Sequence, residues 1–190
     1  MRSVFAVSEL NSSIRICEIR DAAQLSTVAT LAWKIFPTTY EGLIPADQIP
    51  YMMHLMYDQA VLRREFASGV NFAVIRDGAT PIGYLSWHTV DGDDGKAMRL
   101  EKLYLDFAYH GRSIGNLALR FVIDAAVRAG ATFLSLNVNK RNLRAQRAYR
   151  RAGFFCWHEE REPVGNGFFK DDYVMRYDIP RTADATDAPR

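Results

Sequence analysis

Residues 103–116 read Leu103-Tyr104-Leu105-Asp106-Phe107-Ala108-Tyr109-His110-Gly111-Arg112-Ser113-Ile114-Gly115-Asn116. Apolar residues then recur at helical spacing as far as Ala129, so this stretch predicts a strand, a turn that contains glycine, and a helix. At such a junction several backbone N–H groups and the positive end of the helix dipole converge on one point. Gly111 and Gly115 permit a close approach because neither carries a Cβ. We therefore expect an anion such as a pyrophosphate to bind at this turn.

A second pattern lies downstream, where Asn142 is followed seven residues later by Tyr149 and then by Gly153 and Phe154. Seven residues at 100° each return to nearly the same helix face, so Asn142 and Tyr149 project from one side, about 10 Å apart along the axis. A phenol in this position can donate a proton to a leaving thiolate, and an amide can hold the polar arm of a long cofactor.

The opposite half of the same predicted helix carries arginines. We interpret this stripe as a solvated face, and contact of Arg144 or Arg147 with a cofactor phosphate, or with an acidic partner, is the alternative. The stripe consists of Arg141, Arg144, Arg147, Arg150 and Arg151.

Together the two patterns resemble the GNAT superfamily of acyl-CoA-dependent N-acetyltransferases, over roughly residues 14–178. In that family the motif Gln/Arg-x-x-Gly-x-Gly/Ala cradles the CoA pyrophosphate, and here it falls on residues 110–115. His110 replaces the usual Gln or Arg, and Ser113 replaces the first glycine. Backbone N–H groups do most of the phosphate binding, so Ser113 can still donate, but serine is strained if the turn requires a positive φ. We expect weakened or shifted CoA affinity rather than loss.

The later family motif is matched by Asn142, Ala145, Tyr149, Gly153 and Phe154. The resemblance implies that the strand Leu103–Leu105 pairs with pantetheine as an added strand and that one of its N–H groups polarises the thioester carbonyl. It also implies that Tyr149 protonates the CoA thiolate. The cofactor-binding residues implied in this way are Leu103, Tyr104, Leu105, His110, Gly111, Arg112, Ser113, Ile114, Gly115, Asn116 and Asn142.

A weaker resemblance concerns the acceptor. Residues 39–45, 100–104 and 172–175 are similar to the bacterial spermidine/spermine-type acetyltransferases and their uncharacterised relatives. In the branch that acetylates ribosomal-protein N-termini, a glutamate base stands five residues before the cofactor-binding Asn, and here that residue is Asn137. This branch is therefore disfavoured, and Glu101 becomes the candidate base. A structural salt bridge of Glu101 to Lys or Arg is the alternative.

We expect acetyl transfer from acetyl-CoA to a primary amine of a small basic acceptor, with a polyamine-like molecule as the first choice. Amino acids, aminoglycoside-like amines, and peptide or protein amines remain open. The family's first helices form the wall of the acceptor pocket, and Tyr40 and Glu41 are the leading positions there. A non-catalytic acyl-CoA-binding sensor or regulatory protein is the alternative function, because His110 and Ser113 depart from the motif. The family's C-terminal strands commonly pair across dimers, so a homodimer is compatible with the resemblance.

Composition is consistent with one enzyme domain. At 190 residues and 48% hydrophobic residues, the chain can bury one sizeable core. Its net charge of +2 arises from 24 basic and 22 acidic residues, so charge does not predict binding to nucleic acid or membrane. Met1–Ser13 lacks the apolar centre of a signal peptide, and we expect a cytoplasmic protein. Cys17 and Cys156 lie in apolar segments and are predicted to be buried free thiols.

No metal is expected. Asp91–Gly95 resembles the start of a calcium loop, but Gly95 and Lys102 occupy positions that require an oxygen ligand and a glutamate. The stretch is interpreted as a hairpin turn.

The predicted fold is a mixed α/β (α+β) GNAT-type domain at residues 14–179, with an N-terminal extension at 1–13 and a flexible tail at 180–190. Its centre is a mostly antiparallel twisted sheet of about six to seven strands flanked by about four helices. We expect a first helix from Ala22 to Phe36 that Pro37 stops, a helical region at 47–68 broken near Asp58, and a three-strand meander from Phe72 to Leu105.

Overall fold

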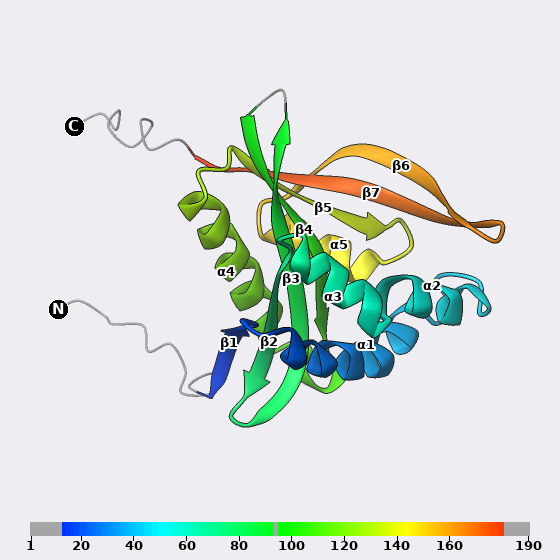
Figure 1. The fold of residues 1–190 in the computed structure, drawn as a ribbon. Helices are drawn as coiled ribbons and strands as arrows, with labels where there is room; N and C mark the ends of the chain where they lie inside the picture. Colours follow the sequence, from blue (N-terminus) through cyan, green and yellow to red (C-terminus); the bar gives the residue numbers. More distant parts are fainter. Residues whose placement is uncertain (1–12, 93–94, 181–190) are drawn as a thin grey trace, which may run out of the picture.

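The computed structural model describes residues 13–92 and 95–180. Its centre is a seven-stranded sheet in the order β1-β2-β3-β4-β5-β7-β6 (Figure 1). Neighbouring strands are antiparallel except for β4 and β5, which run parallel. The strands are β1 (Ile14–Glu18), β2 (Asn71–Asp77), β3 (Thr80–Gly92), β4 (Gly95–Leu105), β5 (Phe133–Asn139), β6 (Phe155–Gly165) and β7 (Phe168–Asp178). The expected mixed α/β fold is confirmed.

Five α-helices flank the sheet in the described part of the chain, one more than expected, because the region at 47–68 forms two helices separated at Asp58. They are α1 (Leu25–Tyr40), α2 (Gln48–Tyr57), α3 (Gln59–Ala67), α4 (Ile114–Arg128) and α5 (Leu143–Arg151). Helices α4 and α5 pack on one face of the sheet, and α1, α2 and α3 cover the other.

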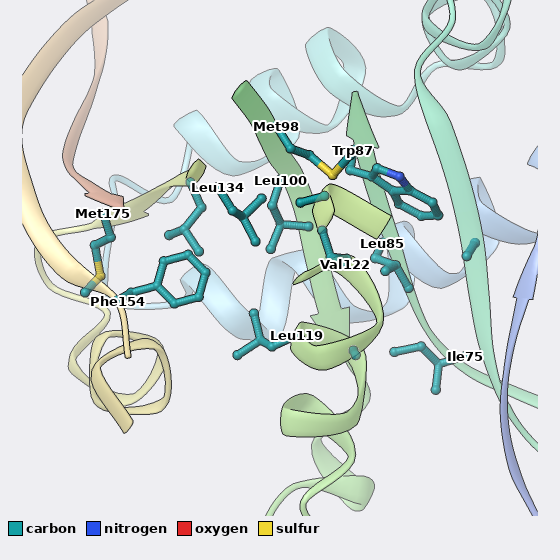
Figure 2. Packing of buried hydrophobic residues seen from close by; sticks show 14 of the residues in the cluster. Ile75, Leu85, Trp87, Met98, Leu100, Leu119, Val122, Leu134, Phe154 and Met175 are labelled. Carbon is teal, nitrogen blue, oxygen red and sulfur yellow. The ribbon is translucent and has the colours of Figure 1, made fainter. Parts of the chain in front are cut away.

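Two apolar cores follow from this layering. Figure 2 shows Val122 of α4 between the sheet residues Leu100 and Leu85, with Leu119 of the same helix below them. On the opposite face, the apolar sides of α1, α2 and α3 bury residues such as Met53 and Leu62 against β2 and β3. The sheet is therefore a buried layer that can hold a site between its strands.

Helix α1 does not stop before Pro37 as predicted, because it continues through this residue to Tyr40. A proline in the last turn of a helix removes only one backbone hydrogen bond. The turn is held by the Thr39 hydroxyl, which donates to Ile35 O at 2.8 Å, and by Glu41 N–H, which donates to Pro37 O at 2.9 Å. The tilted rings of Phe36 and Tyr40, with 4.3 Å between their centroids, add a contact one turn apart in the same helix. The extra turn carries Tyr40 toward the sheet.

The meander of β2, β3 and β4 is present as predicted. The tip of the hairpin at 93–94 lies outside the described residues, as do most of the N-terminal extension and the tail. One irregularity was not predicted: Ser86 pairs with Lys102 and Trp87 pairs with Leu100, so Glu101 is an extra residue in β4. This is a β-bulge, a feature that re-aims side chains and is common next to active sites.

Strands β4 and β5 pair only over part of their length. The last paired residues are Leu100 and Leu136, although β4 continues to Leu105 and β5 to Asn139. Beyond this point the two strands part, and the side of β4 that faces β5 has no strand partner. The opening lies at the centre of the sheet.

The prediction for the two cysteines was wrong in one respect, because both are free but exposed. Cys17 lies on β1 and Cys156 on β6, which are the two edge strands of the sheet. Edge strands have one unpaired side and fewer covering neighbours, which the local apolar pattern does not reveal. Among the described helices, none combines the length and apolar character needed to span a bilayer.

Candidate functional site

A cavity of about 540 Å³ occupies the gap where β4 and β5 part. Residues of α1, the turn before α4, and α5 complete its wall. The sequence-predicted residues that line it are Tyr40, Glu101, Leu103, Tyr104, Leu105, His110, Gly111, Ser113, Ile114, Gly115, Asn116, Asn142 and Tyr149. Arg112 and Glu41 do not line it: the Arg112 guanidinium lies over the ring of Tyr109, and Glu41 is exposed at the end of α1. The fold thus brings thirteen of the fifteen predicted residues to one cavity.

The turn before α4 has the geometry of an anion cradle. Gly111 has φ +79°, and Ser113, the residue before the helix, has φ +60°. Ser113 makes no side-chain capping bond, and within the described residues the N–H groups of residues 111–116 donate to no protein acceptor. The first N–H groups of a helix have no intrahelical partner and carry the positive end of its dipole. A phosphate fits the donors that this turn offers.

Gly115 keeps the mouth of this cradle open. A Cβ built on Gly115 would meet no atom within 4 Å, and the same holds for Gly111. Both positions therefore border free space, and a larger side chain at either would occupy it. The CoA pyrophosphate implied by the sequence pattern is compatible with this arrangement.

The unpaired side of β4 forms a second wall. From Leu103 to Leu105 the backbone pairs with β3 on one side only. Backbone groups on the other side face the cavity, and an extended amide-bearing chain such as pantetheine can pair with them as an added strand. Hydrogen bonding from this edge can also polarise a carbonyl that lies against it.

Tyr149 comes from the end of α5 and faces the same gap. Its ring packs on Phe154, with 5.9 Å between the centroids, and its hydroxyl has no hydrogen-bond partner among the described residues. Burial, together with the nearby Tyr40, raises the pKa of the Tyr149 phenol. The phenol therefore stays protonated at neutral pH, which is the form that a proton donor requires.

Asn142 begins the helix that carries Tyr149. Its side-chain oxygen accepts a hydrogen bond from Ala145 N–H at 3.1 Å, so it is the N-cap of α5. Because the cap uses only the oxygen, the amide NH₂ group is left to donate toward the cavity that Asn142 lines. One residue thus combines a structural role with a binding role.

Glu101 reaches the cavity from the bulge of β4. Its carboxylate accepts a hydrogen bond from Arg99 Nε at 3.0 Å and lies 3.7 Å from His88 Nδ1, and its side chain is 33% exposed. Arg99 also donates to the side chain of Asn137 at 3.0 Å, and Asn137 donates to Glu160 at 2.8 Å. The ion pair foreseen as the alternative role is therefore present, and it holds the carboxylate at the cavity wall.

His110 is held at both ring nitrogens. Its Nε2 lies 2.9 Å from Leu105 O, and its Nδ1 contacts the Arg144 guanidinium. If Nε2–H donates to the carbonyl, Nδ1 accepts from Arg144, which is a neutral imidazole. Burial and the charge of Arg144 lower the pKa of His110 and favour that neutral form. Both ring nitrogens of His110 therefore have partners in the protein.

Tyrosines fill the other end of the cavity. Tyr40 and Tyr104 line it, and their hydroxyl oxygens lie 3.1 Å apart. Behind them, the ring of Tyr84 stacks on Tyr104 with 5.2 Å between the centroids, and its hydroxyl donates to Tyr57 at 2.9 Å. Burial raises the pKa of Tyr40 to about 12 and that of the other three well above the ordinary value. This end of the cavity is an aromatic wall with neutral hydroxyl groups.

Several lining residues were not predicted as site residues. Thr39 reaches the cavity because α1 passes through Pro37, and Asn137 does so because β5 parts from β4. Arg144, Arg147 and Arg151 also line it, so the arginine stripe is not simply a solvated face. The sequence signal for this role was the spacing of the arginines from Asn142 along the same helix.

Comparison with known proteins identifies the family. A family model described as "Acetyltransferase (GNAT) family" matches residues 28–154. An uncharacterized N-acetyltransferase of Mycobacterium bovis is 29% identical over 157 residues, which cover 82% of this chain and 96% of the relative.

Solved structures share the fold. The PaiA N-acetyltransferase of Thermoplasma acidophilum in complex with coenzyme A has a TM-score of 0.70 at 20% identity, covering 87% of this chain and 99% of that one. The ribosomal-protein-S18-alanine N-acetyltransferase of Escherichia coli has a TM-score of 0.65 at 16% identity, covering 88% and 95%. At these identities the structural likeness extends to the fold and not to the acceptor.

Proposed function

The chain belongs to the GNAT family of acetyltransferases, and we propose that it transfers an acetyl group from acetyl-CoA to a primary amine of a small basic acceptor. The observation that carries this proposal is the single cavity in which an anion cradle, an unpaired strand edge and the Tyr149 phenol meet. When bound, acetyl-CoA supplies the acetyl group as a thioester. The remaining chemistry falls to residues of the chain.

Three elements position the donor. The backbone N–H groups of residues 111–116 bind the pyrophosphate, and the Asn142 amide together with the edge at Leu103–Leu105 binds the pantetheine arm. A backbone N–H of this edge donates to the thioester carbonyl oxygen. In acyl transfer generally, a single such donor contributes about 2.7–4 kcal/mol to the transition state.

Two side chains move protons. An alkylammonium with a pKa near that of lysine, about 10.4, must lose a proton before its nitrogen can attack. Glu101 accepts that proton, directly or through a water molecule, and Arg99 keeps its carboxylate aimed at the cavity. Tyr149 donates its hydroxyl proton to the departing sulfur.

The acceptor enters on the face of the sheet that α1 covers. Tyr40 and Tyr104 form its wall, and their rings and neutral hydroxyls suit an amine with an apolar stem. Glu101 is the acidic residue among those that line the cavity in the described part of the chain, which favours a cationic amine over an acidic one.

A steady-state assay of CoA release tests this function. The chain is incubated with acetyl-CoA and a panel that combines polyamines, amino acids and short peptides. We expect saturable release of CoA that depends on a basic small amine. Binding of acetyl-CoA without release in the presence of any amine would instead favour a non-catalytic acyl-CoA sensor.

A further inference from the structure

Asn137 is a polar residue of the cavity wall to which the mechanism above gives no role. It lies on β5, one residue beyond Leu136, where the pairing of β5 with β4 ends. Its side chain accepts a hydrogen bond from the Arg99 guanidinium at 3.0 Å and donates one to the Glu160 carboxylate at 2.8 Å. The amide therefore links β4 to β6 at the point where the central strands part.

The two partners fix the direction in which the Asn137 amide points. A guanidinium offers only donors, and an ionised carboxylate offers only acceptors. The amide oxygen therefore faces Arg99 and the NH₂ group faces Glu160, because the reverse orientation would set donor against donor and acceptor against acceptor. Neither an ionised aspartate nor an aliphatic side chain of the same size can make both hydrogen bonds.

The same guanidinium holds Glu101. Arg99 Nε donates to Glu101 Oε1 at 3.0 Å, while a terminal nitrogen of Arg99 donates to Asn137. His88 Nδ1 lies 3.7 Å from the same oxygen of Glu101, which is too far for a hydrogen bond. The side chains of Arg99 and Glu101 are 29% and 33% exposed, and an ion pair with this exposure fixes two flexible side chains only weakly. A second bond to Asn137 restricts Arg99, and through it Glu101.

Glu160 anchors this series of hydrogen bonds on β6. Its side chain is half-buried and, in the part of the chain that the structure describes, it forms no ion pair. Its cross-strand neighbour is Asp172, a second carboxyl, which is only 8% exposed. A partly buried carboxylate without a cation requires a hydrogen-bond donor, and the Asn137 amide supplies one.

We propose that Asn137 is a positioning residue for Glu101. Its amide is anchored by Glu160 and fixes the Arg99 guanidinium, and Arg99 in turn aims the Glu101 carboxylate at the acceptor amine. The proposal rests on the acetyl transfer proposed above, because Glu101 accepts the proton of the amine in that reaction. The position requires an amide, since the side chain must accept from Arg99 and donate to Glu160 at the same time.

Exchange of the two polar groups tests this assignment. Asn137→Asp keeps the size of the side chain and the acceptor for Arg99, but it sets a second carboxylate against Glu160. With acetyl-CoA and diaminohexane we expect kcat to fall about 10- to 100-fold, because a small misplacement of a catalytic group has an effect of this size. The KM for acetyl-CoA should change little. When Glu160→Gln is added, the amide at position 160 can donate to the carboxylate at position 137, and kcat should return close to the parent value.

Glu159→Gln is the matched control for the second substitution. It removes the same charge one residue away, from a side chain that is 63% exposed and paired with Lys140. Combined with Asn137→Asp, it should leave kcat as low as in the single variant. Asn137→Ala removes both hydrogen bonds without adding a charge; it should also lower kcat, and it replaces Asn137→Asp if thermal denaturation shows that chain to be unfolded.

Two kinetic outcomes would overturn the proposal. One is a kcat within about twofold of the parent in a folded Asn137→Asp or Asn137→Ala chain. The other is a loss in Asn137→Asp that Glu160→Gln does not reverse, because a direct contact between the Asn137 amide and the acceptor would give that result.

An NMR measurement separates this proposal from acetyl transfer itself. If the parent chain acetylates no amine, the proposed activity fails, and the Arg99 Nε–H signal of the isotope-labelled chain then decides on Asn137. This signal is identified by its absence in Arg99→Lys. We expect it to move in Asn137→Asp and to return toward the parent position when Glu160→Gln is added. A signal that stays at the parent position in Asn137→Asp, or that does not return in the double variant, rejects the proposal.

Discussion

At the scale of single residues, Ser113 stands in a backbone conformation that favours glycine. Its φ of +60° lies in the left-handed region, which costs about 1 kcal/mol or more for a residue with a Cβ. The sequence pattern marked this position as strained only if the turn required a positive φ, and the structure meets that condition. The serine is retained although glycine would relieve the strain.

Ser113→Gly should raise the free energy of unfolding by about 1 kcal/mol and tighten CoA binding slightly. The control is Asn166→Gly, because Asn166 has φ +50° in the turn between β6 and β7, away from the cavity. Chemical denaturation and calorimetry with CoA measure the two effects. Asn166→Gly should become more stable without a change in CoA affinity. A Ser113→Gly chain that is no more stable than the parent would show that the turn does not strain the serine.

Tyr149 is the proposed proton donor to the departing CoA sulfur. Tyr149→Phe keeps the ring on Phe154 and removes only the hydroxyl, so acetyl-CoA affinity should remain nearly intact. General-acid catalysis contributes typically about 10²–10⁴-fold, and kcat should fall within that range. Tyr177→Phe is the control, since Tyr177 packs on the same Phe154 without lining the cavity. A kcat of Tyr149→Phe within about twofold of the parent would make Tyr149 structural.

Asp172 should leave a signature in the pH dependence of stability. Because its folded-state pKa of about 6 lies above the ordinary 3.8, its contribution to stability is present at about pH 4 and is lost as the pH rises through 6. Asp172→Asn should therefore be more stable than the parent by at most about 3 kcal/mol near pH 8, with the difference shrinking toward pH 4. Denaturation curves at several pH values measure it. The charged and titratable groups that act on this carboxyl, Tyr40, Glu160, Glu162, Lys170 and Asp171, are unchanged in both chains. A constant difference at all pH values would exclude titration of Asp172 as the cause.

At the scale of elements, local sequence patterns predicted most strands and helices but not how they end. Pro37 is a strong local stop signal, yet the packing of Phe36 against Tyr40 and the hydrogen bond of the Thr39 hydroxyl carry α1 through it. The bulge at Glu101 is equally invisible, because it depends on how β4 pairs with β3. Both features place residues of the site. The contacts that carry α1 through Pro37 lie one turn apart in the same helix, whereas the bulge depends on strand pairing.

Substitutions of two glycines, Gly83 and Gly115, distinguish an effect on the structure of β4 from an effect on cofactor binding. A Cβ on Gly83 would lie 2.5 Å from Tyr104 O and 3.2 Å from Leu105 Cα, so Gly83→Ala must displace the edge of β4. We expect a loss of about 1–3 kcal/mol of stability together with weaker CoA binding. Gly115→Ala meets no atom within 4 Å and should not lower the melting temperature, while it weakens CoA binding. Thermal denaturation and calorimetry distinguish the two. Unchanged CoA affinity in a folded Gly115→Ala chain would contradict the cradle.

At the scale of the whole molecule, the site exists because the central strands part. The sequence predicted a strand next to the cradle and a helix with Asn142 and Tyr149, and the structure brings these together in one cavity. It did not predict that Asn137 and Tyr104 meet there from neighbouring strands, because this arrangement depends on strand order. Sequence motifs predict the acetyl-CoA site more readily than the acceptor site. The proposed acetyl-CoA site consists mainly of backbone groups from a short continuous stretch of sequence, whereas the acceptor site combines side chains from distant elements.

The central claim is direct transfer of an acetyl group between two molecules bound in this cavity. The most direct measurement follows both products at once, with acetylated diaminohexane quantified by mass spectrometry and CoA quantified by its free thiol. We predict equal amounts of the two products, formed only when acetyl-CoA and the amine are both present and strongly reduced in Tyr149→Phe. Release of CoA at the same rate without amine, or the absence of acetylated amine with every acceptor tried, would contradict the claim.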